Sequence, residues 1–276
     1  MVKIRYGTNG NDRFKADPVA EIYMGFGGVD TVDYSSASLG IVVSLDNKYG
    51  DNKPFGRGGA AGDKFSNIEN VIGSWFEDWI VGTADANSLH GLGGDDTIAA
   101  GAGNDYVNGS NGNDLLSGQA GNDIIYGGGL NDIISGGNGD DRMAGGQRED
   151  VLYGGLGSDS FLYNFVYTKD IDEVPTSNVL DLGHDTIHDF SAADRINLYN
   201  LKTADVDRLV VKEQTFHEPG KGTMVKTVLQ VWDGPNNLAE IDLHGVNSSL
   251  RSGQQVEINL IGRDSYVLSL ADLQNL

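Results

Sequence analysis

The feature that most constrains this chain is a nine-residue repeat that runs through its middle. From residue 91 onward the repeat returns without a gap, and its units begin at residues 91, 100, 109, 118, 127, 136, 145 and 154. Each unit opens with a glycine-rich turn, carries aspartate at its sixth position and an apolar residue at its eighth. So short a period is typical of a solenoid, in which each unit buries its apolar residue by stacking on its neighbours.

The register also extends from these units toward the N-terminus. Counting backward, it can be followed from Lys64 to Leu162, and earlier units match at 7–15 and 25–33, with a degenerate unit at 16–24 between them. After Leu162 we expect the period to stop. The eighth-position residues, which we expect in the core, are Ile98, Val107, Leu116, Ile125, Ile134, Met143, Leu152 and Phe161.

The composition of one unit predicts a turn followed by a very short strand. Several glycines per unit exclude a helix, because each costs roughly 1 kcal/mol relative to alanine in a helix interior. Six residues then form the turn, and the last three form a strand that points the eighth side chain inward. Successive turns lie on opposite sides, so one coil spans two units, and strands eighteen residues apart stack in parallel at about 4.8 Å.

This geometry predicts a column of carboxylates along each side of the coil. Like charges about 5 Å apart repel by about 3 kcal/mol at an effective dielectric constant of 20, unless a cation lies between them. Calcium suits such a site because it takes six to eight carboxylate and carbonyl oxygens in irregular geometry. The candidate carboxylate ligands are Asp96, Asp105, Asp114, Asp123, Asp132, Asp141, Asp150 and Asp159, with Asp12, Asp30 and Asp78 in the earlier units. The candidate turn positions are the fourth-position glycines Gly94, Gly103, Gly112, Gly121, Gly139 and Gly157.

Composition excludes several classes of protein. The chain has 40 acidic and 19 basic residues and a net charge of −21, which disfavours nucleic acid and acidic membranes as partners. It has no cysteine, so neither disulfides nor thiolate chemistry is expected. No apolar run reaches about 18 residues and the first residues lack an apolar signal segment, so we expect neither a spanning helix nor a classical signal peptide.

The repeats resemble those of the repeats-in-toxin (RTX) family, with the consensus G-G-x-G-x-D-x-U-x. The flanking segments "GVDTVDYSSASLGIVVSL" and "GHDTIHDFSAADRINLYNL" are similar to segments beside the repeats of serralysin-type proteases and alginate-epimerase modules. The resemblance implies an all-β fold, a right-handed parallel β-roll with an antiparallel β-rich C-terminal cap. It also implies several Ca²⁺ ions between alternate units, an extracellular location, and export by a type I secretion apparatus.

We expect four regions along the chain. Residues 1–33 form partial turns of the roll, and residues 34–63 are an insertion with a strand at 41–45. Residues 64–162 form the calcium-binding roll. Residues 163–276 form the cap and end in the secretion signal, which the resemblance places at the C-terminus.

Two departures from the consensus predict uneven calcium binding. The fourth position, normally glycine, is Leu130 in one unit and Arg148 in another, and both lie on the same side of the coil. We therefore expect full occupancy on the other side and weaker binding between the turns of Asp132 and Asp150, where the arginine supplies a positive charge itself.

The seventh residues of the repeat units on the side of Leu130 and Arg148 are expected to face outward and to form a stripe that is mostly apolar. Either the rest of the chain covers the stripe or a partner does, and the need to shield apolar surface favours the first alternative. The stripe consists of Trp79, Thr97, Leu115, Ile133 and Val151.

The sequence contains no pattern that predicts catalysis. It lacks a G-x-S-x-G motif, and the pair His217-Glu218 is followed by proline without a second histidine. His184 and His188 fall on an expected strand, where they would lie about 13 Å apart. Enzymes of the resembling families carry catalysis in an additional N-terminal domain, for which repeats beginning at Gly7 leave no room. We therefore expect no enzymatic activity.

The function expected is that of a secreted, non-enzymatic calcium-binding protein or module that folds on extracellular calcium. It would assist folding, export, or contact with a polysaccharide or a catalytic domain. Three alternatives stay open: a stand-alone effector acting on host membranes, the non-catalytic part of a larger extracellular enzyme, and a cryptic lyase or hydrolase.

Overall fold

The structure is a computed structural model that describes residues 2–46, 62–164, 184–189, 194–199, 208–218, 222–233, 236–243, 257–261 and 266–268. Every regular element in this part of the chain is a β-strand, and none is a helix. The chain divides into two compact units, residues 1–127 and 128–276.

The first unit holds short strands arranged in three sheets. Their orders are β1-β3-β6, β5-β8-β10-β12 and β2-β4-β7-β9-β11. The strands are β1 (Lys3–Tyr6), β2 (Arg13–Lys15), β3 (Glu21–Met24), β4 (Thr31–Asp33), β5 (Val42–Ser44), β6 (Lys64–Ser66), β7 (Asn70–Ile72), β8 (Trp79–Val81), β9 (Ser88–Gly93), β10 (Thr97–Ala102), β11 (Tyr106–Asn111) and β12 (Leu115–Ala120). A further strand, β13 (Ile124–Gly129), spans the division between the units.

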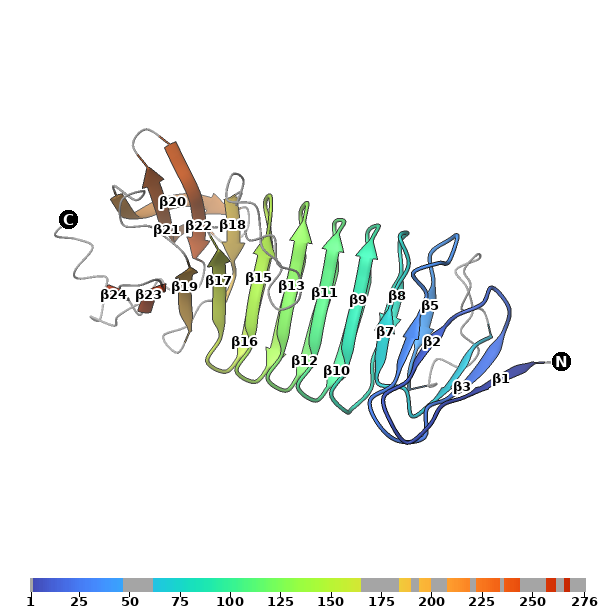
Figure 1. Ribbon diagram of the computed structural model, residues 1–276. Helices are drawn as coiled ribbons and strands as arrows, with labels where there is room; N and C mark the ends of the chain where they lie inside the picture. The colour runs from blue at the N-terminus through green and yellow to red at the C-terminus, as the bar shows by residue number, and fades with distance from the viewer. Residues whose placement is uncertain are drawn as a thin grey trace. The chain divides into compact units, whose positions relative to one another are not determined.

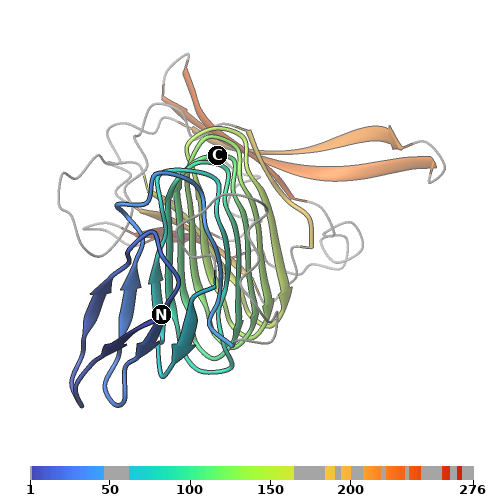
Figure 2. The same cartoon turned by 90° about the vertical axis from the view of Figure 1, so that its right-hand side faces the viewer.

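The stacking of alternate repeats is as predicted. Ile98 pairs in parallel with Ile80 on one side and Leu116 on the other, each eighteen residues away. On the opposite sheet Leu89 pairs with Val107 in the same way. All five side chains are buried, so the eighth position forms the core of the coil. Figure 1 shows β9 and β11 side by side, and Figure 2 shows the coils of residues 62–127 one behind another.

The strands of the regular repeats are longer than the three residues predicted, since β10 has six residues and includes the first three positions of the next unit. The backbone of each unit is nevertheless fixed. In the units from residue 91 to residue 162, the second and fourth positions always have positive φ, as at Gly101 (117°) and Gly103 (108°). This left-handed conformation is strained for residues with a Cβ atom. It is nevertheless kept at the non-glycine residues Leu92, Ser110, Gln119, Leu130 and Arg148.

The second unit contains further coils and a set of longer strands. Its strand orders are β14-β16-β18-β22-β21-β20 and β15-β17-β19-β23-β24. The strands are β14 (Ile133–Asn138), β15 (Arg142–Gly146), β16 (Val151–Leu156), β17 (Ser160–Asn164), β18 (His184–Ile187), β19 (Arg195–Tyr199), β20 (Arg208–Glu218), β21 (Gly222–Asp233), β22 (Asn236–Leu243), β23 (Glu257–Ile261) and β24 (Tyr266–Leu268).

The coil does not end at Leu162, and on this point our expectation was wrong. Leu152 pairs in parallel with Ile187, and Phe161 with Ile196. Each partner is 35 residues away, which is the coil length of eighteen plus an insertion of seventeen. The insertion hides the period from the sequence, although the strands after it still pair as coils.

Antiparallel strands follow these coils, in agreement with the predicted fold class. β20 and β21 form a long antiparallel pair, β22 pairs antiparallel with β21, and β24 pairs antiparallel with β23. β22 and β23 also pair in parallel with β18 and β19. The fold is thus an all-β parallel roll with antiparallel strands in its C-terminal part. The expected secretion signal falls mostly on residues 269–276, outside the described residues.

The structure also differs from the predicted repeat register in the unit that begins at Lys64. Residues 64–66 form strand β6, and Phe65 is buried in the core, although the repeat register made Lys64 the first residue of a turn. The next buried strand residue is Val71, only six positions later. This unit is therefore three residues shorter than the repeat.

The outward stripe is open to solvent at several positions, contrary to the expectation that the chain covers it. In the first unit Trp79 is 44% and Leu115 is 50% exposed, and in the second unit Ile133 is 47% exposed. Thr97 and Val151 are partly exposed. Two more aromatic residues, Trp75 and Phe76, are exposed in the turn just before β8.

Replacing Leu130 by glycine should stabilise the calcium-loaded protein by about 1 kcal/mol, because glycine adopts left-handed backbone at much lower cost. Leu130 has φ of 78° and a largely exposed side chain, so little burial is lost. Chemical denaturation in calcium measures the effect. Gly139→Ala at the same repeat position, with φ of 128°, is the control and should destabilise. An unchanged or lower stability of Leu130→Gly would contradict this account of the turn.

Candidate calcium sites

Aspartates at the sixth position tie successive coils together in the first unit. The Oδ1 atom of Asp96 accepts a hydrogen bond of 2.8 Å from the backbone N–H of Asp78, one coil earlier. Asp114 accepts the N–H of Asp96 at 2.8 Å in the same way. On the other side of the coil Asp123 accepts the N–H of Asp105 at 2.8 Å. One carboxylate oxygen of each of these residues therefore belongs to the backbone scaffold.

The second unit repeats this arrangement and extends it. Asp150 Oδ1 accepts the N–H of Asp132 at 2.8 Å, and Asp159 Oδ1 accepts that of Asp141 at 3.0 Å. Beyond the repeats, Asp185 Oδ1 accepts the N–H of Asp150 at 3.0 Å.

Asp194 Oδ1 likewise accepts the N–H of Asp159 at 2.9 Å. Sequence reasoning missed Asp185 and Asp194 as members of the columns. The signal that could have found them is a local triplet, an acid two residues before isoleucine, in "DTI" and "DRI".

The second carboxylate oxygen is the unusual feature of these columns. All eight aspartates of the units from residue 91 to residue 162 are only 1–2% exposed. A buried carboxylate oxygen without a donor is costly, since it has lost its water without replacement. The Oδ2 atoms that are buried without a hydrogen-bond partner include those of Asp30, Asp96, Asp105, Asp150 and Asp159.

Backbone carbonyls converge on the same places. A Cβ atom added at Gly91 would overlap Asp96 Oδ2 and would lie 2.8 Å from the carbonyl oxygen of Gly109 in the next coil. Gly136 has the same relation to Asp141 and to the carbonyl oxygen of Gly154. The first position of the turn is thus kept free of a side chain where a carboxylate oxygen and a carbonyl oxygen meet.

This donor set fits calcium. Among the described residues, no three His, Cys, Asp or Glu side chains gather in a cluster, so carboxylates alone do not form the site. Carboxylate oxygens supplemented by backbone carbonyls are the ligands that Ca²⁺ accepts, and the chain has no cysteine that could supply a thiolate. The oxygens that lack donors, together with the carbonyls beside them, would hold the ion and have their charge neutralised by it.

Burial raises the pKa values of these carboxyl groups in the metal-free protein. The pKa of Asp96 rises to about 9, because its burial is reinforced by the neighbouring charges of Asp78 and Asp114. Burial is also the main cause that raises the pKa of Asp105 and of Asp159 to about 6. Without a cation, burial therefore makes ionisation of these carboxyl groups less favourable than in water, most of all at Asp96.

The three earlier candidate ligands differ from one another. Asp30 has the open Oδ2 atom of the later repeats. Asp12 Oδ2 instead accepts the backbone N–H of Thr8 at 2.6 Å, and Asp78 Oδ2 accepts that of Ser74 at 2.6 Å. Asp12 and Asp78 thus lack the open oxygen, and only Asp30 has the environment of the later repeat aspartates.

The two turns without glycine at the fourth position keep the shape of their neighbours. Leu130 and Arg148 have φ values of 78° and 81°, in the left-handed region that glycine adopts at Gly139 and Gly157. Weaker calcium binding between Asp132 and Asp150 stays a prediction, because the backbone alone does not distinguish these turns.

A third acidic column lies at the N-terminal end, in the sheet β1-β3-β6. Asp63 Oδ1 accepts the backbone N–H of Glu21 at 2.8 Å, which repeats the hydrogen bond of the repeat aspartates. Here, however, the second oxygen of Asp63 accepts the hydroxyl of Tyr34 at 2.6 Å. The pKa of Asp63 is raised to about 6, mainly by burial.

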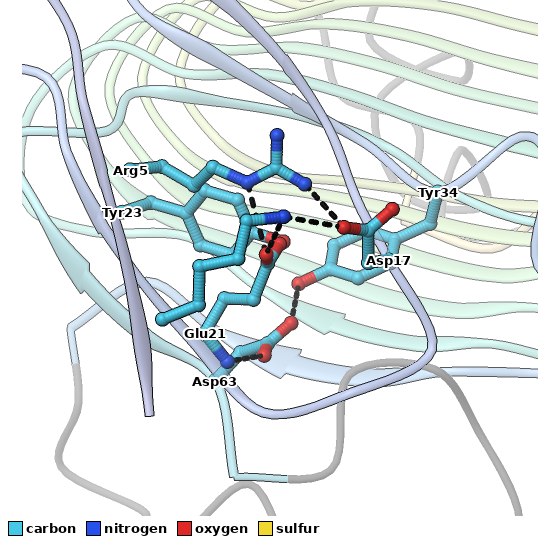
Figure 3. Close-up of polar contacts among 7 residues, drawn as sticks. Arg5, Asp17, Glu21, Tyr23, Tyr34 and Asp63 are labelled. Atoms are coloured by element: carbon cyan, nitrogen blue, oxygen red, sulfur yellow. Dashed lines mark hydrogen bonds and ion pairs between the residues drawn. The ribbon is translucent and has the colours of Figure 1, made fainter. Parts of the chain in front are cut away.

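Positively charged side chains complete this third column (Figure 3). Glu21 is fully buried, and its Oε1 atom accepts Arg5 Nε at 2.9 Å and lies 3.0 Å from Lys3 Nζ. Its Oε2 atom accepts the hydroxyl of Tyr23 at 2.7 Å. At this end of the chain, side-chain donors occupy the carboxylate oxygens that the later repeats leave open.

Comparison with known proteins agrees with this geometry. The family model described as the RTX calcium-binding nonapeptide repeat matches residues 72–107, 100–134 and 135–164. Residues 72–164 consist of RTX calcium-binding repeats. Calcium binding by this part of the chain follows from the repeat family.

No curated protein matches the chain. Among solved structures, the AlgE6R3 subunit of the mannuronan C5-epimerase from Azotobacter vinelandii is similar at 22% sequence identity. The match covers 71% of this chain and 88% of that one, with a TM-score of 0.28. A search of the described residues for a helix able to cross a membrane found none.

Acid should favour the fold of the calcium-free RTX repeats. A pKa raised from 3.8 to about 6 or about 9 means that protons bind the folded chain more tightly. Proton binding by these carboxyl groups therefore stabilises the folded chain. This stabilisation is complete below the ordinary pKa of aspartate and is lost as the pH rises through the raised pKa values. In EGTA, the β-sheet circular dichroism signal should therefore increase when the pH is lowered from about 8 to about 5.

With calcium present, acidification should act in the opposite sense and weaken ion binding, because the ligands must be deprotonated. The calcium-loaded protein at each pH is the control. A sheet signal in EGTA that stays the same or falls on acidification would show that the carboxyl groups are not buried in the metal-free fold.

Proposed function

We propose that this protein is a secreted, non-enzymatic calcium-binding module that completes its fold when it meets extracellular calcium. The observation that carries the proposal is the series of buried Oδ2 atoms without donors, at Asp96, Asp105, Asp150 and Asp159 among others. A fold that buries these oxygens is disfavoured until a cation reaches them.

The free energy of calcium binding is large enough to drive folding of the repeats. Extracellular calcium modules bind with dissociation constants near 10⁻⁴ M. At millimolar calcium each such site would add about 1.4 kcal/mol, and five sites about 7 kcal/mol. This is comparable to the whole stability of a typical domain, whereas the sites add almost nothing at cytosolic calcium levels.

The same physics suits export in an unfolded state. A net charge of −21 disfavours compaction while calcium is scarce, which leaves the chain extended inside the cell. We infer that a type I secretion apparatus exports the chain by its C-terminal segment. The resemblance of the repeats and their flanks to exported proteins supports this step.

The role outside the cell would be to support a partner rather than to catalyse. The aspartates of the columns are committed to the backbone of the next coil, which does not suit acid–base work. His188 stacks on Tyr153 with ring centroids 4.8 Å apart, which suits a packing role. The exposed side chains Trp75, Phe76 and Trp79 supply a surface for a polysaccharide or a catalytic domain.

Circular dichroism of the full chain with and without calcium tests the proposal. In EGTA at neutral pH we expect little sheet signal from the repeats, and in millimolar CaCl₂ a large cooperative gain. Magnesium chloride at the same concentration is the control and should give little, because Mg²⁺ demands a tight octahedral shell. A full sheet signal in EGTA, unchanged by calcium, would refute calcium-driven folding.

A further inference from the structure

The repeats of this chain contain turns of two kinds. In the open kind, the second and fourth positions are both left-handed and the aspartate keeps an unpartnered oxygen. Gly101, Gly103 and Asp105 form one such turn, with φ values of 117° and 108° at the glycines. The turn of Phe26, Gly28 and Asp30 is also open.

In the closed kind, the turn hydrogen-bonds to its own acid. Ser74 donates its backbone N–H to Asp78 Oδ2 at 2.6 Å and its hydroxyl to Asp78 Oδ1 at 2.7 Å. Thr8 donates its N–H at 2.6 Å and its hydroxyl at 3.0 Å to Asp12 Oδ2. Neither the second nor the fourth residue of these turns has positive φ.

A third turn is closed with an amide in place of the acid. Thr83 donates its N–H to Asn87 Oδ1 at 2.7 Å and its hydroxyl at 3.2 Å. The Nδ2 atom of Asn87 then donates to the carbonyl oxygen of Glu69 at 2.7 Å. A side-chain donor here reaches a backbone carbonyl of the neighbouring coil, the kind of oxygen that a cation would otherwise bind.

We propose that the second residue of each nonapeptide decides whether the turn takes a calcium ion or closes on its own side chain. A hydroxyl at this position can cap the acid, and the β-branched threonine also disfavours left-handed backbone. Ser110 shows that a hydroxyl alone is insufficient, because it keeps φ of 79° and donates to Asn108 instead. In the Ser74 turn the fourth residue is Phe76 rather than glycine, which favours closure.

The distribution of the two kinds of turn sets where calcium is needed. The closed turns lie at residues 7–12, 73–78 and 82–87, whereas all the turns from residue 91 to residue 159 have the open backbone. Apart from the open turn at Asp30, the first coils are therefore held largely by their own hydrogen bonds, and the continuous requirement for calcium begins with the unit at 91. This inference rests on the proposed function, since it concerns which turns carry the ions.

The test is the number of calcium ions bound by the full chain, measured by isothermal titration calorimetry and by equilibrium dialysis. Thr8→Gly should open the exposed turn at Asp12 and add one ion. Ser110→Thr should close the turn at Asp114 and remove one ion, and Ser110→Gly is its matched control with the wild-type number. The double variant Thr8→Gly/Asp12→Asn should return to the wild-type number.

The outcomes separate this inference from the proposed function. A wild-type chain that binds no calcium would refute the proposed function itself. A wild-type chain that binds calcium while Thr8→Gly and Ser110→Thr both keep its ion number would overturn the role of the second position. So would an additional ion in Thr8→Gly that persists when Asp12 is replaced. Circular dichroism in calcium confirms that each variant is folded, and Thr8→Gly keeps the test valid if Ser110→Thr does not fold.

Discussion

The structure depends on a buried carboxylate that is only half satisfied. At Asp96, for example, one carboxylate oxygen accepts the backbone N–H of Asp78 in the preceding coil, and the other is buried without a hydrogen-bond partner. This hydrogen bond fixes the acid in the interior, and the same burial deprives its other oxygen of water. The short strands cannot compensate on their own, because each contributes few buried apolar side chains, such as Ile98 and Ala100 of β10. A calcium ion between carboxylate and carbonyl oxygens satisfies the acid and joins adjacent coils at the same time.

Elsewhere the chain meets the same requirement with its own atoms. The side chains of Lys3, Arg5 and Tyr23 contact the carboxylate of Glu21. Tyr34 donates its hydroxyl to Asp63, so each carboxylate oxygen of the N-terminal acidic column has a donor. Two positions next to these acids carry an apolar residue in place of another acid. In the first unit the N–H of Ile41 donates to Asp78 at 2.8 Å, and in the second unit Ile241 of β22 is the strand partner of Asp185. Both isoleucines are buried, so at these two positions a side chain that needs no cation takes the place of an acid.

The sequence allowed the period and the parallel stacking to be predicted, because a strict repeat leaves few alternatives for burying Ile98 or Leu116. The length of the strands was predicted wrongly, since β10 continues through the glycine-rich positions to Ala102 instead of ending after three residues. It did not reveal that Asp185 and Asp194 continue the columns, since parallel pairing tolerates an insertion that a search for a fixed period does not. The difference between Asp12 and Asp30 was also missed. It depends on whether the second residue of the turn is left-handed, and a consensus centred on the acid does not encode this. The exposure of Trp79 and Leu115 could not be predicted either, because it depends on where the non-repetitive part of the chain lies.

The most direct test of the central claim is an anomalous difference map from crystals of the full chain grown in calcium, calculated around the turn of Asp105. The account predicts an ion about 2.3–2.6 Å from Asp105 Oδ2, with backbone carbonyl oxygens completing its shell. An ordered Asp105 whose Oδ2 atom instead accepts a hydrogen bond from protein or water, with no ion beside it, would contradict the claim that calcium satisfies these buried acids.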